Sequence, residues 1–528
     1  MKALSVIYGG RLDPKAFEEL LPGGAGEQGT ALAKTSAFSL ALSAAGRFPG
    51  VEKTIFIALE AKEYPDLPPG VEAVFRPSWT RISLLEEISR ASAGFDLVYF
   101  TWADCPLLDP ALAAGMAERH IRYCAEYSYA DGWPYGFAPE LLSHQTAGIL
   151  AKLSENDDGP VERDAIFHVI QKDINAFDIE TEISPVDLRH YRLKLAADSK
   201  RNLLLLGRLM EAGLKSAADA EKIIVERPEL LRTLPNFFSI MVTAACPQAC
   251  SLCPWPKYSG DLISGKDPMS RADFEKLLDK IIEFAGDAVI DLSLWGELAL
   301  HPESVELIKM VLTRPALSLI VETSGIGWKN EDLNSLALLS KEAAPRINNM
   351  APLSWIVSLD AFDPGRYGEV RGAGFAEAKA CAKSLLELFP GNAYVQALRV
   401  KDSEDDIEQF YRHWTKGAKD SSHVIIQKYD DFAGALPKLQ TTDLSPVKRR
   451  PCWHIIRDMN ILLDGSVACC REDIGALKEG AGKGILGNVF IDDLALIWEK
   501  GTNLYMEHCK EKYEGICTNC DEYYTYNF

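Results

Sequence analysis

The sequence predicts a multidomain α/β protein, and three observations carry this prediction. A chain of 528 residues is too long for one hydrophobic core, which indicates two to four domains. Short apolar strands alternate with helical stretches along most of the chain, as in sheets of mainly parallel strands. Cysteines gather in two groups, residues 246–253 and 452–520, and in a reducing compartment grouped thiols indicate bound metal more often than disulfides.

The composition excludes some classes of partner. Hydrophobic residues make up 47% and charged residues 25% of the chain, as in ordinary globular proteins. The formal net charge of −20 argues against a nucleic-acid or anionic-membrane surface, because binding phosphate needs a positive field. No apolar run is long enough to span a bilayer, and residues 1–8 are typical of a first buried strand. We therefore expect a cytoplasmic protein with no nucleic-acid or membrane partner.

The first 210 residues are typical of one α/β domain. The predicted strands are 4–8, 54–59, 71–75 and 97–101, and a helix is predicted at 110–123. Asp104 follows the last of these strands, so its carboxylate is expected at the edge of the sheet where α/β proteins bind ligands. The alternative is that Asp104 is only a turn residue of a structural scaffold.

This region resembles the nucleotidyltransferase fold of sugar-activating enzymes, especially sugar cytidylyltransferases. The resemblance rests on 104–107 (Asp-Cys-Pro-Leu), 133–137, 161–169 and 198–203. It implies that Asp104 and Asp198 are ligands of a magnesium ion, which usually takes one or two carboxylates. The first strand is not followed by the Gly-rich, basic loop that binds a triphosphate in this family. We therefore expect a domain that has lost transfer activity and still binds a nucleotide or nucleotide-sugar.

Residues 211–235 are predicted to be a helical connector, and residues 236–435 a regular series of strands and helices. The predicted strands are 237–243, 288–294, 317–323, 355–359, 393–400 and 423–429. The predicted helices include 273–284, 375–388 and 407–414. Six strands joined by right-handed helical crossovers predict a partial (β/α)6 barrel, whose ligands bind at the carboxyl ends of the strands.

The cysteines of this domain lie at that functional edge. Cys246, Cys250 and Cys253 follow the first predicted strand, and their spacing lets three thiols meet on one side of a loop. Three thiolates on a four-iron cluster leave one iron open to an outside ligand. The alternative is a zinc site, but structural zinc takes four protein ligands.

Behind these cysteines the domain resembles the radical S-adenosylmethionine superfamily. Segments 295–302, 322–325 and 357–360 end the second, third and fourth strands in the order of that family's motifs. The resemblance implies a [4Fe–4S] cluster on the three cysteines, with S-adenosylmethionine on its open iron. The residues expected to bind that cofactor are Gly296, Glu297, Thr323, Ser358, Asp360 and Arg399. Strand alternation is expected to bring Gln396 and Arg399 to the same edge, so Arg399 is a candidate to clamp the carboxylate of S-adenosylmethionine.

The implied chemistry is reductive cleavage of S-adenosylmethionine to a 5′-deoxyadenosyl radical that abstracts a hydrogen atom from the substrate. The cofactor supplies the reactivity, and the protein supplies aim and exclusion of water. Such an enzyme also needs an electron donor such as flavodoxin or ferredoxin.

The last segment, residues 445–528, carries a second set of thiols. Asp464-Gly465 between two apolar runs predicts a hairpin that brings Cys452 toward Cys469 and Cys470 on adjacent strands. The segment resembles the SPASM/twitch extension of radical S-adenosylmethionine enzymes. The resemblance implies one auxiliary [4Fe–4S] cluster, held by Cys452, Cys470, Cys517 and Cys520. Cys469 and Cys509 are left as neighbours of this set, and a zinc knuckle is the alternative.

The whole order of domains resembles the uncharacterised spiro-SPASM proteins. We expect a radical S-adenosylmethionine enzyme that oxidises or modifies a sugar or nucleotide-sugar presented by the first domain. A second possibility is a maturase that modifies a peptide, and a third is a non-catalytic metal-binding scaffold. No peptide-binding module is evident before the barrel, which favours the sugar.

Overall fold

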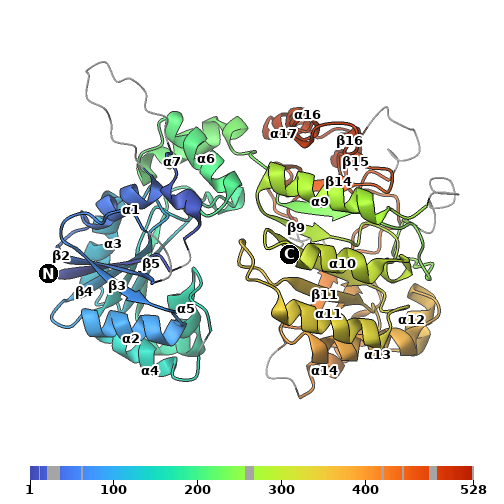
Figure 1. Ribbon diagram of the computed structural model, residues 1–528, viewed down its shortest axis with the longest axis horizontal. Helices are drawn as coiled ribbons and strands as arrows, with labels where there is room; N and C mark the ends of the chain where they lie inside the picture. Colours follow the sequence, from blue (N-terminus) through green and yellow to red (C-terminus); the bar gives the residue numbers. More distant parts are fainter. Residues whose placement is uncertain are drawn as a thin grey trace. The chain divides into compact units, whose positions relative to one another are not determined.

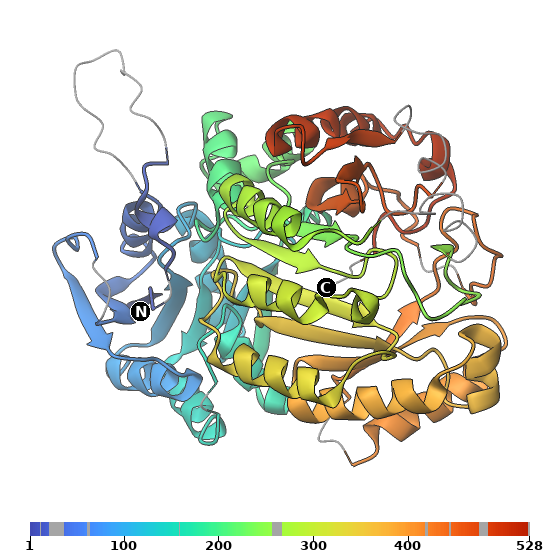
Figure 2. The same ribbon diagram turned by 45° about the vertical axis from the view of Figure 1, so that its right-hand side comes forward.

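The structure is a computed structural model of the chain. It describes all residues except 11, 21–35, 61–63, 158, 256–266, 418–420, 443–444, 475–483 and 526–528. The chain divides into two compact units, Met1–Thr233 (unit 1) and Leu234–Phe528 (unit 2), each built on its own sheet (Figures 1 and 2). The predicted α/β class is confirmed in both units.

Unit 1 contains a seven-stranded sheet in the order β3-β2-β1-β4-β6-β5-β7. Its strands are β1 (Ala3–Tyr8), β2 (Val51–Leu59), β3 (Val71–Arg76), β4 (Leu97–Trp102), β5 (Tyr127–Asp131), β6 (Glu140–Ser143) and β7 (Ile179–Ile183). Strand β1 pairs in parallel with β2 and β4, and β6 runs antiparallel between β4 and β5. Every residue of β1 and β4 is buried, as expected for strands covered on both faces.

Seven α-helices are described in unit 1. They are α1 (Ala37–Ala45), α2 (Arg81–Ala91), α3 (Pro110–Arg122), α4 (His144–Leu153), α5 (Ala165–Ile170), α6 (Lys200–Glu211) and α7 (Ala217–Glu226). Helix α3 begins with Pro110 behind an Asp109 cap, whose Oδ1 accepts from Ala111 N at 2.8 Å. The other oxygen of Asp109 accepts from Ala217 N at 2.9 Å. The start of the predicted connector is therefore fastened to unit 1.

Unit 2 contains a nine-stranded sheet in the order β13-β12-β11-β10-β9-β8-β14-β15-β16. Its first six strands are β8 (Phe237–Ile240), β9 (Ala288–Asp291), β10 (Leu317–Thr323), β11 (Leu353–Ser358), β12 (Ala393–Arg399) and β13 (Val424–Lys428). These six lie side by side in chain order and pair in parallel throughout, which confirms the predicted array. Strand β8 ends three residues earlier than predicted, where the chain leaves the sheet for the cysteine loop.

The C-terminal segment extends the same sheet. Strand β14 (Asp458–Ile461) pairs in parallel with β8, and β15 (Ser466–Ala468) and β16 (Ile485–Asn488) follow antiparallel. The predicted hairpin joins β14 to β15, and Gly465 in its turn has a φ of +83°, a value that favours glycine. Cys452 does not lie on a strand as predicted, because it caps the short helix α15 (Trp453–Arg457) that precedes β14.

Helices cover one face of this sheet, as Figure 2 shows for α9, α10, α11 and α13. The further helices of unit 2 are α9 (Arg271–Ala285), α10 (Ser304–Leu312), α11 (Asn330–Glu342), α12 (Pro364–Val370), α13 (Phe375–Leu388), α14 (Glu404–Thr415), α16 (Leu494–Lys500) and α17 (Thr502–Cys509). The main apolar core of the unit includes buried side chains of α9, α10, α11 and α13 together with those of the strands. Within the described ranges, no helix combines the length and apolar character needed to cross a membrane.

Candidate functional site

The carboxyl ends of the parallel strands of unit 2 open on a cavity of about 250 Å³. Side chains from β8 and from β13 line the same cavity, and so does Asp458 of β14. Because strands five places apart in the sheet face one space, the sheet must curve around it. This is the open barrel edge at which the sequence places the chemistry.

The inner face of the six parallel strands is layered, because residues i and i+2 of a strand share a face. The lower layer is apolar and consists of Phe237, Val289, Ile320, Ile356, Tyr394 and Ile425. Two residues further along each strand lies a polar layer, which we call the polar belt. It consists of Ser239, Asp291, Glu322, Ser358, Gln396 and Gln427, all of which line the cavity.

Cys246, Cys250 and Cys253 line this cavity together. Burial raises the pKa of all three thiols, that of Cys253 to about 12. The charges of Cys250 and Cys246 raise the pKa of Cys253 further, so the three sulfur atoms act on one another. Thiols in this environment stay protonated unless a cation binds them, and a metal ligand must be deprotonated.

The cysteine loop is braced by Arg371, a residue that the sequence analysis did not single out. Its Nη1 donates to Gln248 Oε1 at 3.0 Å, and its Nε donates to Asp360 Oδ2 at 2.7 Å. Gln248 also donates to the Tyr367 hydroxyl at 2.8 Å, and Ser251 N donates to Val370 O at 2.8 Å. The loop between the first two cysteines is therefore tied to the end of β11 and to α12.

The Gly296-Glu297 turn lies directly against the start of that loop. Gly296 has a φ of +81°, and a Cβ atom there would lie 2.1 Å from the carbonyl oxygen of Thr243, so no other residue fits. Glu297 N donates to Ala245 O at 2.7 Å. The Glu297 carboxylate accepts from Thr323 Oγ1 and from Ser324 N, both at 2.7 Å, and from Ala299 N at 3.2 Å, and no described basic side chain forms an ion pair with it. The structure thus brings Gly296, Glu297 and Thr323 together at the cavity, as the sequence predicts.

Two tryptophans that stack beside the Gly296-Glu297 turn were not predicted from the sequence. Trp295 stacks on Trp255, with ring centroids 5.4 Å apart and planes 12° from parallel. Trp255 donates from its Nε1 to Ala244 O at 3.1 Å. This hydrogen bond joins the two ends of the segment that carries the three cysteines, and the stacked rings hold that segment against the Gly296-Glu297 turn.

Ser358 and Asp360 also line the cavity, but both are engaged within the protein. Ser358 Oγ donates to Glu322 Oε1, so it belongs to the polar belt. Asp360 accepts from Arg371 through Oδ2 and from Leu398 N through Oδ1 at 2.9 Å. Arg371 thus neutralises the charge of Asp360, so Asp360 positions its neighbours and does not present an unpaired charge to a ligand.

Arg399 is not part of the cavity wall, and its predicted place was wrong. Gln396 and Leu398 of β12 line the cavity, so Arg399, at an odd spacing from both, points to the opposite face. Its Nε donates to Glu404 Oε1 at 2.9 Å, and both side chains are about half exposed. The strand period of two should have excluded it, because residues three apart in a strand never share a face.

The second set of cysteines is not among the residues that line the cavity. The charges of Cys517 and Cys520 act on Cys452, and those of Cys452 and Cys469 act on Cys470, each raising the pKa beyond the effect of burial. Burial raises the pKa of Cys520 to about 12. Cys509 packs in the same apolar cluster as Cys452. The four thiols predicted for an auxiliary site are thus brought into one neighbourhood.

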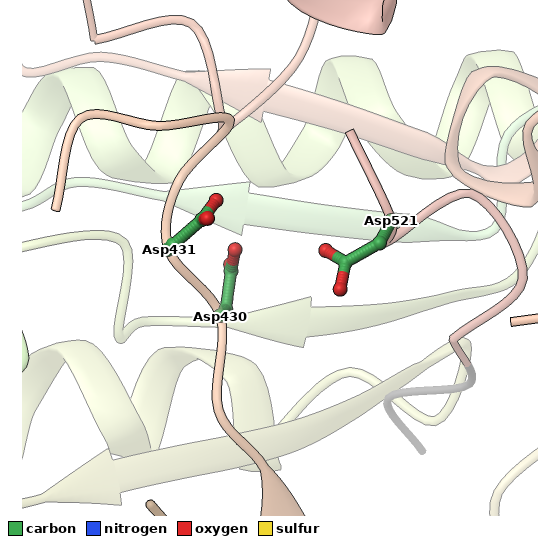
Figure 3. Close-up of side chains that lie close together, drawn as sticks. All are labelled: Asp430, Asp431 and Asp521. Atoms are coloured by element: carbon green, nitrogen blue, oxygen red, sulfur yellow. The ribbon is translucent and has the colours of Figure 1, made fainter. Parts of the chain in front are cut away.

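Three carboxylates, Asp430, Asp431 and Asp521, point toward one another beside this neighbourhood (Figure 3). One oxygen of each lies within 4.8 Å of the others. Lys428 donates to Asp521 Oδ2 at 2.9 Å and also pairs with Glu522. The ammonium group of Lys428 therefore already offsets part of the negative charge of this cluster. An acidic group of this kind is common without an ion, and we assign no ligand to it.

The two carboxylates predicted to hold magnesium in unit 1 are joined by a guanidinium. Arg163 Nη1 donates to Asp104 Oδ1 at 2.8 Å, and its Nη2 pairs with Asp104 Oδ2 and with Asp198 Oδ2 at 3.1 Å. Lys194 pairs with Asp198 as well. The positive charges of Arg163 and Lys194 thus balance the negative charges of the two aspartates. The Trp102 ring packs on the guanidinium, with the Arg163 Cζ 4.5 Å from the ring centroid. This arrangement does not fit a magnesium ion between Asp104 and Asp198.

The chain has relatives without an assigned activity. No family model matches it. An uncharacterized protein of Treponema pallidum (strain Nichols) is 36% identical over 372 residues, which cover 69% of this chain and 98% of that protein. A second uncharacterized protein of the same organism is 34% identical over 61 residues, or 12% of this chain and 28% of that protein.

Three solved structures illustrate more distant likenesses. BtrN in complex with AdoMet and 2-DOIA is 16% identical over 55% of this chain and 94% of that chain, with a TM-score of 0.36. Streptococcus suis SuiB bound to the precursor peptide SuiA is 14% identical, over 58% of this chain and 74% of that chain, with a TM-score of 0.41. A cytidylyltransferase from Leptospira borgpetersenii is 18% identical, over 44% of this chain and 95% of that chain, with a TM-score of 0.34. At such identities the chemistry of the site rests on the chain's own residues.

Proposed function

This chain belongs to the same family as the uncharacterized Treponema pallidum protein, and we propose that it is a radical S-adenosylmethionine enzyme acting on a sugar or nucleotide-sugar. One observation carries the proposal. Cys246, Cys250 and Cys253 share a cavity with Glu297 and with the polar belt, at the carboxyl ends of six parallel strands. We therefore assign the cluster, the cofactor and the substrate to this one cavity.

The donor set fits a [4Fe–4S] cluster with one open iron. Three thiols come from one loop, and no fourth cysteine or histidine is among the described residues of the cavity wall. When bound, the cluster and S-adenosylmethionine would supply a 5′-deoxyadenosyl radical that removes a hydrogen atom from the substrate. The protein's part is to hold these groups at fixed positions and to keep water away from them.

Glu297 is the residue that we assign to the amino group of S-adenosylmethionine. Thr323 and Ser324 hold its carboxylate in place from the neighbouring strand end, and the main chain of Glu297 is tied to the cysteine loop. An ammonium bound there would lie against the loop that carries the cluster. Arg371 has a positioning role, because it fixes that loop through Gln248.

The polar belt supports a hydroxyl-rich substrate. The belt offers hydroxyl, amide and carboxylate side chains around the inner wall, and such groups exchange hydrogen bonds with sugar hydroxyls. For unit 1 we propose that it binds the nucleotide or the nucleotide-sugar, on the nucleotidyltransferase resemblance of residues 104–203. Arg163 would then take over the neutralising role of a metal ion.

Cys452, Cys470, Cys517 and Cys520 are proposed to hold one auxiliary [4Fe–4S] cluster. Such a cluster would accept the second electron of a substrate oxidation. A reduced flavodoxin or ferredoxin would supply the first electron to the other cluster.

Isotope transfer tests this function. The reconstituted enzyme is incubated anaerobically with dithionite, S-adenosylmethionine and perdeuterated nucleotide-sugars. We expect deuterium in the 5′-deoxyadenosine that forms, and none with the Cys250→Ala variant. If peptides pass deuterium and no nucleotide-sugar or free sugar does, the sugar assignment is wrong.

A further inference from the structure

The polar belt carries two negative charges and no positive one. Asp291 lies on β9 and Glu322 on the adjacent β10, and the other four members are neutral. Asp291 is 9% exposed, whereas Glu322 is exposed and lines the cavity. Burial raises the pKa of both carboxyl groups, and the charge of Asp291 raises that of Glu322 further.

Three of the four neutral members of the belt, Ser239, Ser358 and Gln396, donate hydrogen bonds to these carboxylates. Ser239 Oγ donates to Asp291 Oδ2 at 2.9 Å, and Ser293 N donates to Oδ1 at 3.0 Å. Gln396 Nε2 donates to Glu322 Oε1 at 2.9 Å, and Ser358 donates to the same atom. Among the residues that the structure describes, none donates to Glu322 Oε2. One carboxylate oxygen is therefore fixed in direction and left to face the cavity.

The basic side chains of the cavity wall are committed elsewhere. Arg371 pairs with Asp360 at 2.7 Å, Arg471 with Glu472 at 3.1 Å, Arg457 with Asp458 at 2.5 Å and Lys428 with Asp521 at 2.9 Å. Each basic residue of the described wall thus has a carboxylate partner, and Asp291 and Glu322 form no ion pair in the described chain. The charge of Arg471 still lowers the pKa of both Asp291 and Glu322, and that of Arg371 lowers the pKa of Glu322, so these cations favour the ionised carboxylates without pairing with them. A belt with this balance repels an anionic group and attracts a cationic one.

We infer that the substrate brings a protonated amine to Glu322 and Asp291 and turns hydroxyl groups toward Gln396 and Gln427. This inference rests on the proposed function only in taking the cavity as the substrate site. A charge-assisted hydrogen bond from an ammonium to Glu322 Oε2 supplies the donor that this atom lacks. Any phosphate of the substrate would lie outside the belt. The amine can come from an amino sugar or from a lysine side chain, and these two sources are separable.

Equilibrium dialysis of the reconstituted enzyme with S-adenosylmethionine, without reductant, tests this inference. The probes form two matched pairs, D-glucosamine with D-glucose and L-lysine amide with L-norleucine amide. At pH 7 we expect the amine of at least one pair to bind at least tenfold more tightly than its neutral partner. The sugar pair showing this preference would indicate an amino sugar, and the other pair a lysine side chain.

The preference is expected to vanish in Glu322→Gln and in Asp291→Asn, and to persist in Glu331→Gln, which makes the same charge change on the exposed surface of α11. Equal binding within both pairs, absence of binding, or a preference that survives Glu322→Gln would overturn the inference. Because dialysis needs no cleavage of S-adenosylmethionine, an enzyme that forms no 5′-deoxyadenosine yet retains the amine preference would refute the proposed function alone.

Discussion

Ser324 donates its backbone N–H to Glu297 Oε2 at 2.7 Å, which joins the ends of two adjacent parallel strands by one charge-assisted bond. The acceptor is 3% exposed and sits beside the loop that carries Cys246. The carboxylate is therefore oriented before any cofactor arrives. Preorganisation of this kind lowers the cost of binding, because no side chain has to be immobilised at that moment.

Glu297→Gln removes the charge while keeping the shape. An amide leaves at least one of the donors from Thr323 and Ser324 facing an NH2 group, which costs about 1–3 kcal/mol of stability in a buried site. We expect the affinity for S-adenosylmethionine to fall by at least about tenfold, because the ammonium loses an ionised acceptor. Dialysis with labelled cofactor measures this loss. Glu387→Gln on the exposed surface of α13 is the control and should bind normally. Unchanged affinity in Glu297→Gln would rule out its assigned role.

Arg371→Ala tests the brace on the cysteine loop. The substitution leaves the Asp360 carboxylate, 2% exposed, without its cation, and such a loss typically costs about 3–5 kcal/mol. Arg371→Lys keeps the charge but cannot reach both Asp360 and Gln248 with a planar fork. We therefore expect Arg371→Lys to fold and to bind fewer irons at the first site. Urea unfolding and iron analysis measure the two effects. Full iron content in Arg371→Lys would show that the brace is dispensable.

Arg163→Gln should create a metal site in unit 1. Removing the guanidinium leaves Asp104 and Asp198 facing each other with Lys194 as the remaining cation. We expect Mn²⁺ to raise the thermal unfolding midpoint of the variant and to leave that of the wild type unchanged. Arg189→Gln, which removes an exposed arginine paired with Asp131 and Asp187, is the matched control. Stabilisation of the wild type by Mn²⁺, lost in Asp104→Asn, would show that a metal displaces Arg163.

His120 makes unit 1 sensitive to acid. Burial lowers its pKa to about 4, and its Nδ1 lies 2.7 Å from Ser128 Oγ. Since the unfolded chain takes up the proton near pH 6.5, the neutral folded form contributes stability above that pH and loses it as pH falls toward 4. We expect the free energy of unfolding of the wild-type protein to fall by about 2 kcal/mol between pH 8 and pH 5, relative to that of His120→Asn. Hydrogen exchange of the β5 amides measures this difference, and parallel pH profiles for both proteins would contradict it.

Much of the fold was predictable from periodicity. Strands β1, β4 and β10 and helix α13 appear within about two residues of their predicted bounds, because buried apolar runs and amphipathic stretches carry clear signals. The pairing of β14 with β8 was not predictable. Strands 221 residues apart in sequence, from Phe237 to Asp458, carry no local signal of their contact.

The candidate site was predictable where glycine and cysteine fix local geometry. Gly296 and the three cysteines are examples, since close backbone approach and metal binding each demand one residue type. Arg371 and Arg163 were missed, because a buried guanidinium is recognised only by the carboxylates that surround it in space. The belt was hidden for another reason. Its members recur once per strand, and their common layer appears only when the register of six strands is known.

The most direct measurement is the iron content per chain together with 5′-deoxyadenosine formation after anaerobic reconstitution. We predict about eight irons in the wild-type protein, with 5′-deoxyadenosine formed from S-adenosylmethionine and dithionite. For Cys250→Ala we predict about four irons and no 5′-deoxyadenosine. A wild-type protein that holds about eight irons and forms no 5′-deoxyadenosine, or a Cys250→Ala variant that cleaves the cofactor at the full rate, would contradict the proposed function.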